Sequence, residues 1–196
     1  MQQKSSSEIK DFSIPIQRLI LFGFKNHLDR NALYINSEYF TYSDLFQRIA
    51  GIVDRLNKYT TVDSIGVYCN NDVETYCATI AVGIVGAAFV PLNTKFPNAR
   101  NRKICEQSGL KLILSSSPIL FLNEITTEAK VISISANSLS ITNYSIDELL
   151  SLTSKETYNN YSTILFTSGT TGEPKGVPLT KQNINYFFDY QLRNYD

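Results

Sequence analysis

The sequence predicts an α/β fold in which helices cover a mainly parallel sheet. Short apolar runs, which are typical of buried strands, alternate with longer segments whose apolar residues recur at helical spacing. Signals that alternate in this way indicate strand–helix–strand units with parallel strands. The composition is that of a globular chain, because 43% of the 196 residues are apolar and 18% are charged.

The first clear helix signal covers residues 40–56. Its apolar side chains fall on one face, and Thr41 and Asp44 have the spacing of a capping box, which satisfies the first free amides of a helix. Residues 65–69 follow as a buried strand. An apolar helix is then predicted to begin at Asn71 and Glu74 and to end near Gly83 and Gly86, and a strand follows at 87–92. After these we expect a helix at 99–108 capped by Asn98, a strand at 110–114, a short helix with Pro118 in its first turn, and a strand at 131–134.

The C-terminal part contains a strand at residues 161–166 and an aromatic-rich helix at 181–195, capped by Thr180. We therefore expect four parts. They are a disordered N-terminal tail at 1–11, a first α/β subdomain at 12–152, a polar linker at 153–160, and the start of a second subdomain at 161–196.

Charge and cysteine content narrow the class of protein. Eighteen basic and eighteen acidic residues give no net charge, so we expect neither a nucleic-acid partner nor an anionic membrane partner. Three widely spaced cysteines without a C-x-x-C pair argue against a disulfide framework and a zinc site. The apolar run at 19–24 is too short to span a membrane, and the single histidine, His27, is expected at the surface. We expect a cytoplasmic protein.

The segment TSGTTGEPKG, residues 167–176, directly follows the strand at 161–166. Glycines allow positive φ, so successive backbone N–H groups can point into one concavity and bind phosphate oxygens. Four hydroxyl groups add donors, and Lys175 adds a mobile positive charge. The order of strand, glycine and hydroxyl loop, and lysine suits a polyphosphate.

The common nucleotide motifs do not fit this loop. A Walker loop needs lysine directly after glycine, whereas Glu173 and Pro174 precede Lys175 here. A G-x-G-x-x-G fingerprint is absent after the strand at 65–69, where the sequence continues NND. A phosphotransferase of the Walker type is therefore disfavoured.

The string ILFTSGTTGEPKGV, residues 164–177, resembles the phosphate-loop signature of the adenylate-forming (AMP-binding) superfamily. This superfamily includes nonribosomal peptide synthetase adenylation domains, D-alanine carrier-protein ligases, acyl-CoA synthetases and luciferases. Two upstream segments are similar to family segments in the same order: FTYSDL at 40–45 to LTYxEL, and VGAAFVPL at 85–92 to KAGAAYVPL. The resemblance spans residues 16–196 and implies the N-terminal portion of the family's large domain.

The resemblance implies an ATP-dependent ligase that activates a carboxylic acid as an acyl-adenylate, releases pyrophosphate and passes the acyl group to a thiol. It implies phosphate contacts by Thr167 and Ser168 and neutralisation of the outer phosphates by Lys175, while Glu173 and Pro174 shape a turn. The cradle would be formed by Gly169, Thr170, Thr171 and Gly172. Mg²⁺ is expected with ATP, but its carboxylate ligand in the family lies beyond Asp196.

The family's acyl pocket, adenine-binding segment, ribose-binding aspartate and catalytic lysine also follow the loop in sequence. We therefore expect a fragment with no catalytic and no metal-ligating residue of its own, inactive without the C-terminal portion of the same enzyme. Lys175 belongs to the loop and is not the catalytic lysine.

Two local features point to different branches of the family. The pattern from Pro97-x-x-Arg100 through Lys103-Ile104 to residues 108–114 resembles amino-acid-activating members. Asn93-Thr94 departs from their usual Asp-Pro and resembles acyl-CoA ligases. We favour an amino acid as substrate and a carrier-protein phosphopantetheine thiol as acceptor. An acyl-CoA synthetase-type ligase and a noncatalytic degenerate module that binds a partner remain alternatives.

Overall fold

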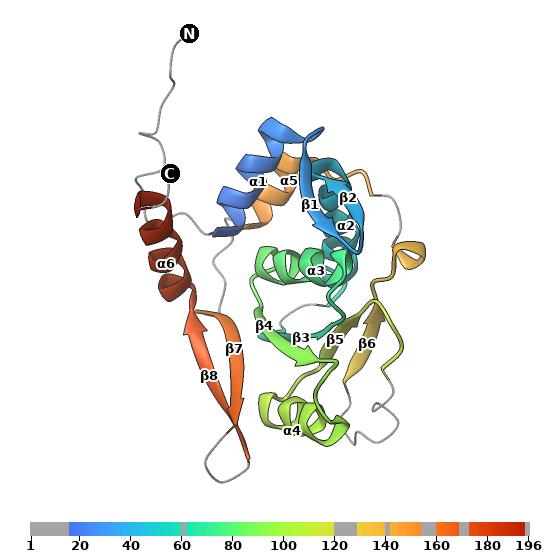
Figure 1. Ribbon diagram of the computed structural model, residues 1–196, viewed down its shortest axis with the longest axis vertical. Coiled ribbons are helices and arrows are strands. Elements are labelled where there is room, and N and C mark those ends of the chain that lie inside the picture. The colour runs from blue at the N-terminus through green and yellow to red at the C-terminus, as the bar shows by residue number, and fades with distance from the viewer. Residues whose placement is uncertain are drawn as a thin grey trace.

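The computed structural model describes residues 16–59, 62–119, 129–139, 142–153, 160–168 and 173–194. Its centre is a six-stranded, mainly parallel sheet in the order β6-β5-β3-β4-β7-β8, and a separate hairpin pairs β1 with β2 (Figure 1). The central strands are β3 (Ser64–Cys69), β4 (Ala88–Asn93), β5 (Leu112–Ser115), β6 (Lys130–Ser133), β7 (Tyr161–Ser168) and β8 (Pro174–Thr180), and the hairpin is β1 (Asn31–Ile35) and β2 (Glu38–Thr41). The predicted α/β class is confirmed.

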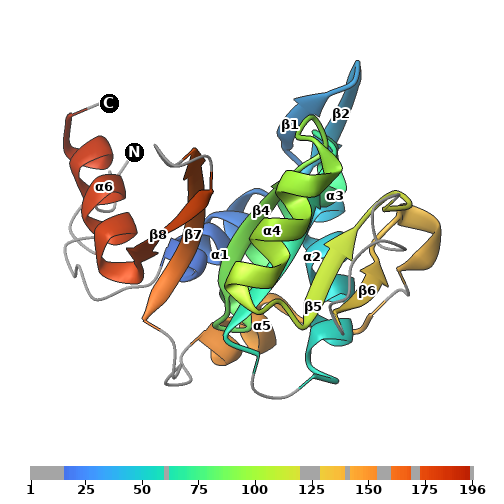
Figure 2. The ribbon, with the colours of Figure 1, turned by 90° about the horizontal axis from the view of Figure 1, so that it is seen from below.

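Helices lie on both faces of the sheet. Figure 2 shows α4 in front of the sheet and α2 and α3 behind it, with α1 and α5 on that same side. The helices are α1 (Ile16–His27), α2 (Tyr42–Leu56), α3 (Val73–Ile84), α4 (Asn98–Ser108), α5 (Ile146–Thr153) and α6 (Lys181–Asn194). The connections β3–α3–β4 and β4–α4–β5 therefore run over opposite faces.

The strand β5 shows why the sheet needs both layers. Leu112 and Leu114 pack into the apolar cluster on the α2 and α3 side, whereas Ile113 packs into the cluster on the α4 side. Successive side chains of a strand point to opposite faces, so all three are buried only if helices cover both. Gly66 of β3 allows close packing on the α4 side, because an added Cβ would lie 2.8 Å from Leu110 Cδ1.

The predicted capping box of α2 is present. The Thr41 backbone N–H donates to Asp44 Oδ2 at 2.8 Å, and the Asp44 N–H donates to Thr41 Oγ1 at 3.1 Å. The hydrogen bonds from Thr41 hold the pKa of the Asp44 carboxyl below its ordinary value. Local sequence alone therefore fixes where this helix begins.

Two predicted helix starts are wrong by one residue. Asn71 does not cap α3, because its backbone is left-handed (φ 55°) and the extended Asp72 instead accepts the Thr75 N–H at 2.8 Å. Asn98 is the first residue of α4 and Pro97 is its N-cap, without a side-chain capping bond. A side chain caps only where its own backbone precedes the helix in an extended conformation. The cap predicted at Thr180 is present, since its hydroxyl accepts the Asn183 N–H at 3.0 Å.

No sequence pattern predicted α1, β2, α5 or β8, and Phe40 and Thr41 of the helix predicted at 40–56 belong to β2. The helices α1 and α5 contact each other, and Lys25 Nζ lies 2.8 Å from Asp147 Oδ1 between them. Of the short helix at Pro118, only residues 118 and 119 are described, and neither is helical.

The predicted tail at 1–11 and residues 154–159 of the predicted linker lie outside the described ranges. The strand β7 joins the central sheet beside β4, with Thr163 opposite Phe89. The division into two subdomains stays a prediction.

Candidate functional site

The strand β7 carries the first two predicted phosphate-binding residues. Its Ile164 and Phe166 pack against the apolar cluster on the α4 side, whereas Thr167 and Ser168 are exposed at its carboxyl end. Because β7 runs parallel to β4, and β4 parallel to β3, the carboxyl ends of all three strands lie at the same edge of the sheet. The apolar part of β7 thus anchors a polar end at that edge.

The strand β8 returns along β7 as the second half of a hairpin (Figure 1). The register places Lys175 opposite Thr167 and Pro174 opposite Ser168. The Thr167 hydroxyl donates to the Lys175 carbonyl at 3.5 Å, and the Lys175 side chain is exposed. The hairpin therefore brings Thr167, Ser168 and Lys175 together at one end. The other predicted site residues lie outside the described residues, namely Gly169, Thr170, Thr171 and Gly172.

Of the turn expected at Glu173 and Pro174, only Glu173 lies in a bend, because Pro174, Lys175 and Gly176 begin the strand β8. Proline is tolerated there because β8 is an edge strand and Pro174 is its first residue. Packing explains the glycine at position 176, since an added Cβ would lie 3.1 Å from Phe166 Cζ. A glycine at this position lets the Phe166 ring cross over β8.

The contact of Lys103 with the hairpin was not predicted from the sequence. The Nζ of Lys103 in α4 lies 2.5 Å from Glu173 Oε1. Glu173 directly precedes β8, so this ion pair ties α4 to the start of that strand. It also offsets a carboxylate charge that would repel phosphate at the end of the hairpin. The two residues are 70 positions apart, and no sequence pattern pairs them.

A crevice of about 670 Å³ lies at the carboxyl ends of β3 and β4. The connections that leave these neighbouring strands cross opposite faces of the sheet, and ligands of open α/β sheets bind at such switch points. The crevice is lined in part by Cys69, Asn70, Asn93, Thr94 and Lys95. The crevice is located by the order of the strands in the sheet. The sequence does not reveal that order, so the crevice could not be predicted.

The buried thiols offer no nucleophile. Burial raises the pKa of both the Cys77 and the Cys105 thiol to about 12, so both stay protonated near neutral pH. His27 is exposed at the end of α1. Within the described part of the chain, no three His, Cys, Asp or Glu side chains lie close enough together to hold a metal ion.

The sequence matches the family model "AMP-binding enzyme" over residues 23–195. It is 33% identical over 156 residues to surfactin synthase subunit 1 of Bacillus subtilis, covering 78% of this chain and 4% of that protein. It is also 31% identical over 166 residues to the hybrid PKS-NRPS synthetase iliA of Neonectria, covering 80% of this chain and 4% of that protein. The chain thus spans a small fraction of the curated relatives it matches.

Solved structures have the same fold. The nonribosomal peptide synthetase FmoA3 in its AMPPNP-bound form superposes with a TM-score of 0.75 at 17% identity, over 93% of this chain and 19% of that one. The four-domain nonribosomal peptide synthetase AB3403, bound to AMP and glycine, superposes with a TM-score of 0.69 at 23% identity, over 91% of this chain and 12% of that one. No helix in the described ranges is both long and apolar enough to cross a membrane.

Proposed function

This chain belongs to the family of AMP-binding enzymes, and we propose that it supplies the phosphate-binding part of a ligase that adenylates an amino acid. The observation that carries the proposal is the hairpin of β7 and β8. It holds Thr167 opposite Lys175 and Ser168 opposite Pro174, at the two ends of the five-residue segment GTTGE. The hairpin pairs with β4, whose carboxyl end forms one side of a crevice at a switch point, where a ligand of this fold is expected.

The described residues fit the β- and γ-phosphates of ATP. Ser168 offers an exposed hydroxyl donor, and Lys175 offers a cation on the paired strand. The Thr167 hydroxyl donates to a phosphate once its long 3.5 Å bond to the Lys175 carbonyl breaks. Glu173 is neutralised by Lys103, so the described end of the hairpin has an excess of positive charge. We assign Gly169, Thr170, Thr171 and Gly172 to the cradle, from the family resemblance.

In the proposed reaction, ATP donates its adenylyl group to a carboxylate and pyrophosphate leaves. The part of this chain is to hold the departing pyrophosphate and to stabilise the charge that builds on it. Lys175 is the residue we propose for that charge, and the hydroxyls of Thr167 and Ser168 orient the phosphate oxygens. Mg²⁺ would accompany ATP. Near the hairpin the described carboxylate of Glu173 is engaged by Lys103, so we assign no Mg²⁺ ligand to this chain.

The proposed partners come from the relatives and from the family. An amino-acid substrate is supported by the neighbour bound to AMP and glycine, and a carrier-protein phosphopantetheine thiol by a neighbour that contains adenylation and PCP domains. We propose that residues 161–196 begin a second subdomain, completed by the C-terminal portion of the same enzyme. Three unpaired cysteines favour a reducing compartment such as the cytoplasm.

An acyl-CoA synthetase-type ligase is the second candidate. The observation that favours it is Asn93-Thr94, which lines the crevice where amino-acid-activating members usually have Asp-Pro. An amino acid and a fatty acid, each offered as the substrate for exchange of labelled pyrophosphate into ATP, would separate the two candidates. A noncatalytic module would give exchange with neither.

The variant Lys175→Ala tests the proposed phosphate site. In a protein of the relatives' length that contains this segment, we expect kcat/KM for ATP in pyrophosphate exchange to fall roughly 100-fold, because a donor to the leaving group is lost. Lys111→Ala, at an exposed lysine on the loop before β5, is the control and should leave exchange unchanged. Unchanged ATP kinetics in Lys175→Ala would remove Lys175 from the site.

A further inference from the structure

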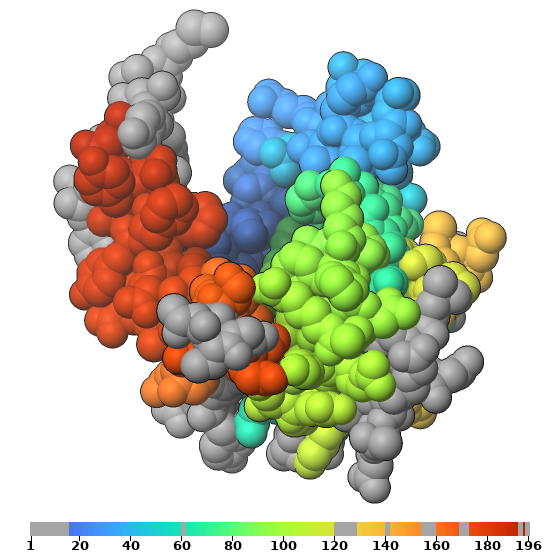
Figure 3. All heavy atoms as spheres, turned by 60° about the horizontal axis from the view of Figure 1, so that its bottom comes forward, coloured from blue at the N-terminus to red at the C-terminus, as the bar shows by residue number. Residues whose placement is uncertain are grey.

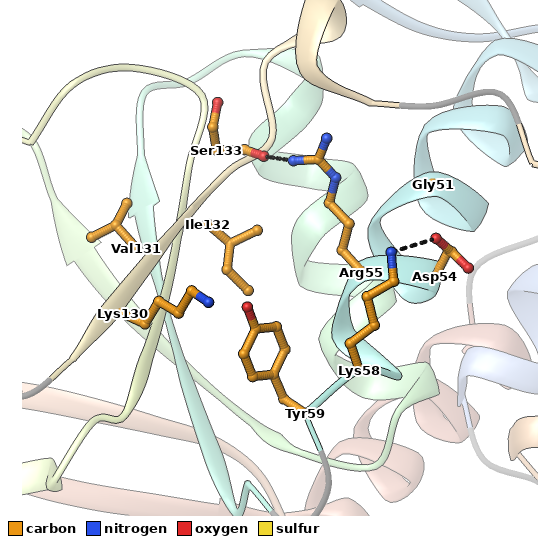
Figure 4. A pocket seen from close by; sticks show the side chains of 9 residues that line it. All are labelled: Gly51, Asp54, Arg55, Lys58, Tyr59, Lys130, Val131, Ile132 and Ser133. Carbon is orange, nitrogen blue, oxygen red and sulfur yellow. Dashed lines mark hydrogen bonds and ion pairs between the residues drawn. The ribbon is translucent and has the colours of Figure 1, made fainter.

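A second concave site lies at the opposite end of the sheet from the hairpin. A pocket of about 370 Å³ opens between the C-terminal end of α2 and the edge strand β6 (Figure 4). Three strands, β5, β3 and β4, separate β6 from β7, which puts the two strands about 20 Å apart at ordinary strand spacing. The pocket is therefore a site of its own.

The pocket has an excess of positive charge. Arg55, Lys58 and Lys130 line it, and Asp54 is the one acidic residue among its lining residues. Asp54 is engaged by Lys58, whose Nζ lies 3.4 Å from Asp54 Oδ2. Arg55 and Lys130 have no ion pair with a carboxylate within the described ranges. An anion in the pocket would therefore meet two cations that no acidic side chain of the described residues neutralises.

Both cations are held in place from opposite sides. Arg55 comes from α2, and its Nη1 donates to the Ser133 carbonyl of β6 at 2.5 Å, which leaves its other N–H groups available. Lys130 comes from β6, and its Nζ lies 5.1 Å from the centre of the Tyr59 ring. Figure 4 shows the Lys130 ammonium and the Tyr59 hydroxyl facing the same space, with Arg55 farther along β6. Side chains fixed in this way lose little freedom when they bind a ligand.

Each cation has a structural explanation of its own. Lysine on an edge strand discourages pairing with another chain, and a cation near a helix C-terminus offsets the negative end of the helix dipole. These explanations require neither residue to face a pocket. They also do not account for the tyrosine hydroxyl, a further donor, beside the same space.

We propose that this pocket binds a small anion that carries carboxylate or phosphate groups, between Arg55, Lys130 and Tyr59. The volume suits a compact metabolite, since ligand pockets of about 300–1,000 Å³ hold molecules up to drug size. Charge-assisted hydrogen bonds to Arg55 and Lys130 supply the affinity, and the Tyr59 hydroxyl adds a directional contact. The inference does not rest on the adenylation activity.

Titration calorimetry of the 196-residue chain with citrate and, separately, with inorganic phosphate tests the proposal. We expect saturable binding of at least one probe, and the arm that binds tells carboxylate from phosphate chemistry. Lys130→Gln should weaken that binding about tenfold or more, because it removes a hydrogen bond to a charged group. Its thermal unfolding should match that of the wild type, since Lys130 is exposed at the sheet edge.

Lys175→Gln is the matched control, because the β7–β8 hairpin also attracts anions. Probe binding at the α2–β6 pocket should be unchanged in this variant, as followed by the amide NMR shifts of Val131 and Ser133. The proposal is overturned if neither probe binds, if Lys130→Gln binds as the wild type does, or if Lys175→Gln abolishes binding. Should Lys130→Gln fail to fold, the amide shifts of Val131 and Ser133 in the wild type test the proposal instead, and it is overturned if neither responds to a probe.

Discussion

At the scale of single residues, Asp44 shows how one side chain fixes a helix start. Its carboxylate accepts the N–H and the hydroxyl of Thr41 at 2.8 and 2.7 Å, and its own N–H donates to Thr41. Both bonds from Thr41 favour the ionised carboxylate, which is why its pKa is lowered. The contact is local, so the sequence predicted it.

Replacing Asp44 with Asn tests this contact. We expect the free energy of unfolding near neutral pH to fall by about 1 kcal/mol, the usual value of a cap. A carboxyl whose pKa is lowered by folding contributes stability above its unfolded pKa and loses it as the pH falls through the folded pKa. Wild type and variant should therefore converge below the ordinary value of 3.8, as measured by urea unfolding across pH.

Asp29→Asn is the control, because Asp29 is exposed in the turn after α1. Its stability should stay within about 0.5 kcal/mol of the wild type at every pH. If the free energies of unfolding of Asp44→Asn and the wild type differ by the same amount down to low pH, the charge of Asp44 does not contribute to this contact.

At the scale of elements, the site depends on how α4 meets β8. These elements contact each other, and the pair Lys103–Glu173 lies between them. Both side chains are about half exposed, at 45% and 54%, so the pair adds little to global stability. Its effect should be local, on the start of β8 where Lys175 lies.

Charge reversal at Lys103 tests this local effect. In Lys103→Glu we expect amide hydrogen exchange at residues 175–177 to quicken about threefold, because a surface ion pair contributes up to roughly 1 kcal/mol and its loss here is local. Lys103→Glu combined with Glu173→Lys should restore the wild-type rate. Lys25→Glu, which breaks the similar pair between α1 and α5, should leave β8 unaffected. Equal exchange in the wild type and Lys103→Glu would show that the pair does not hold β8.

At the scale of the whole molecule, one end of the chain exposes apolar surface. Large apolar side chains of β7, β8 and α6 are exposed, and the space-filling view shows α6 standing away from the β1–β2 hairpin (Figure 3). They are Tyr161, Leu165, Val177, Tyr186, Phe187, Phe188 and Tyr190. So many exposed apolar side chains on neighbouring elements favour a contact with other protein.

We therefore expect the isolated chain to self-associate as its concentration rises. Phe187→Ser combined with Tyr190→Ser should keep it monomeric in sedimentation velocity, because these side chains are 56% and 59% exposed. Tyr34→Ser combined with Tyr39→Ser removes side chains of similar exposure, 60% and 64%, from the β1–β2 hairpin. This control should associate as the wild type does. A wild type that stays monomeric at high concentration would contradict the prediction.

The sequence by itself determined what is encoded within a few neighbouring residues. Helical spacing and the Thr41–Asp44 capping box predicted α2, and apolar runs predicted the central strands. The segment at 167–176 indicated the family. The helix cap predicted at Asn71 was wrong because the left-handed backbone of Asn71 prevents it from capping α3. The strand β8 was not predicted because it forms by pairing with β7. A glycine–proline segment carries no strand signal of its own.

Only the tertiary structure decided which distant residues meet. The strand order that places β3 beside β4 creates the crevice, the packing of α4 brings Lys103 to Glu173, and the edge position of β6 brings Lys130 to Arg55 and Tyr59. Capping and periodicity act over a few residues, so a linear pattern records them. Pairing across a sheet depends on the register and packing of segments far apart in the chain, and no local pattern records those.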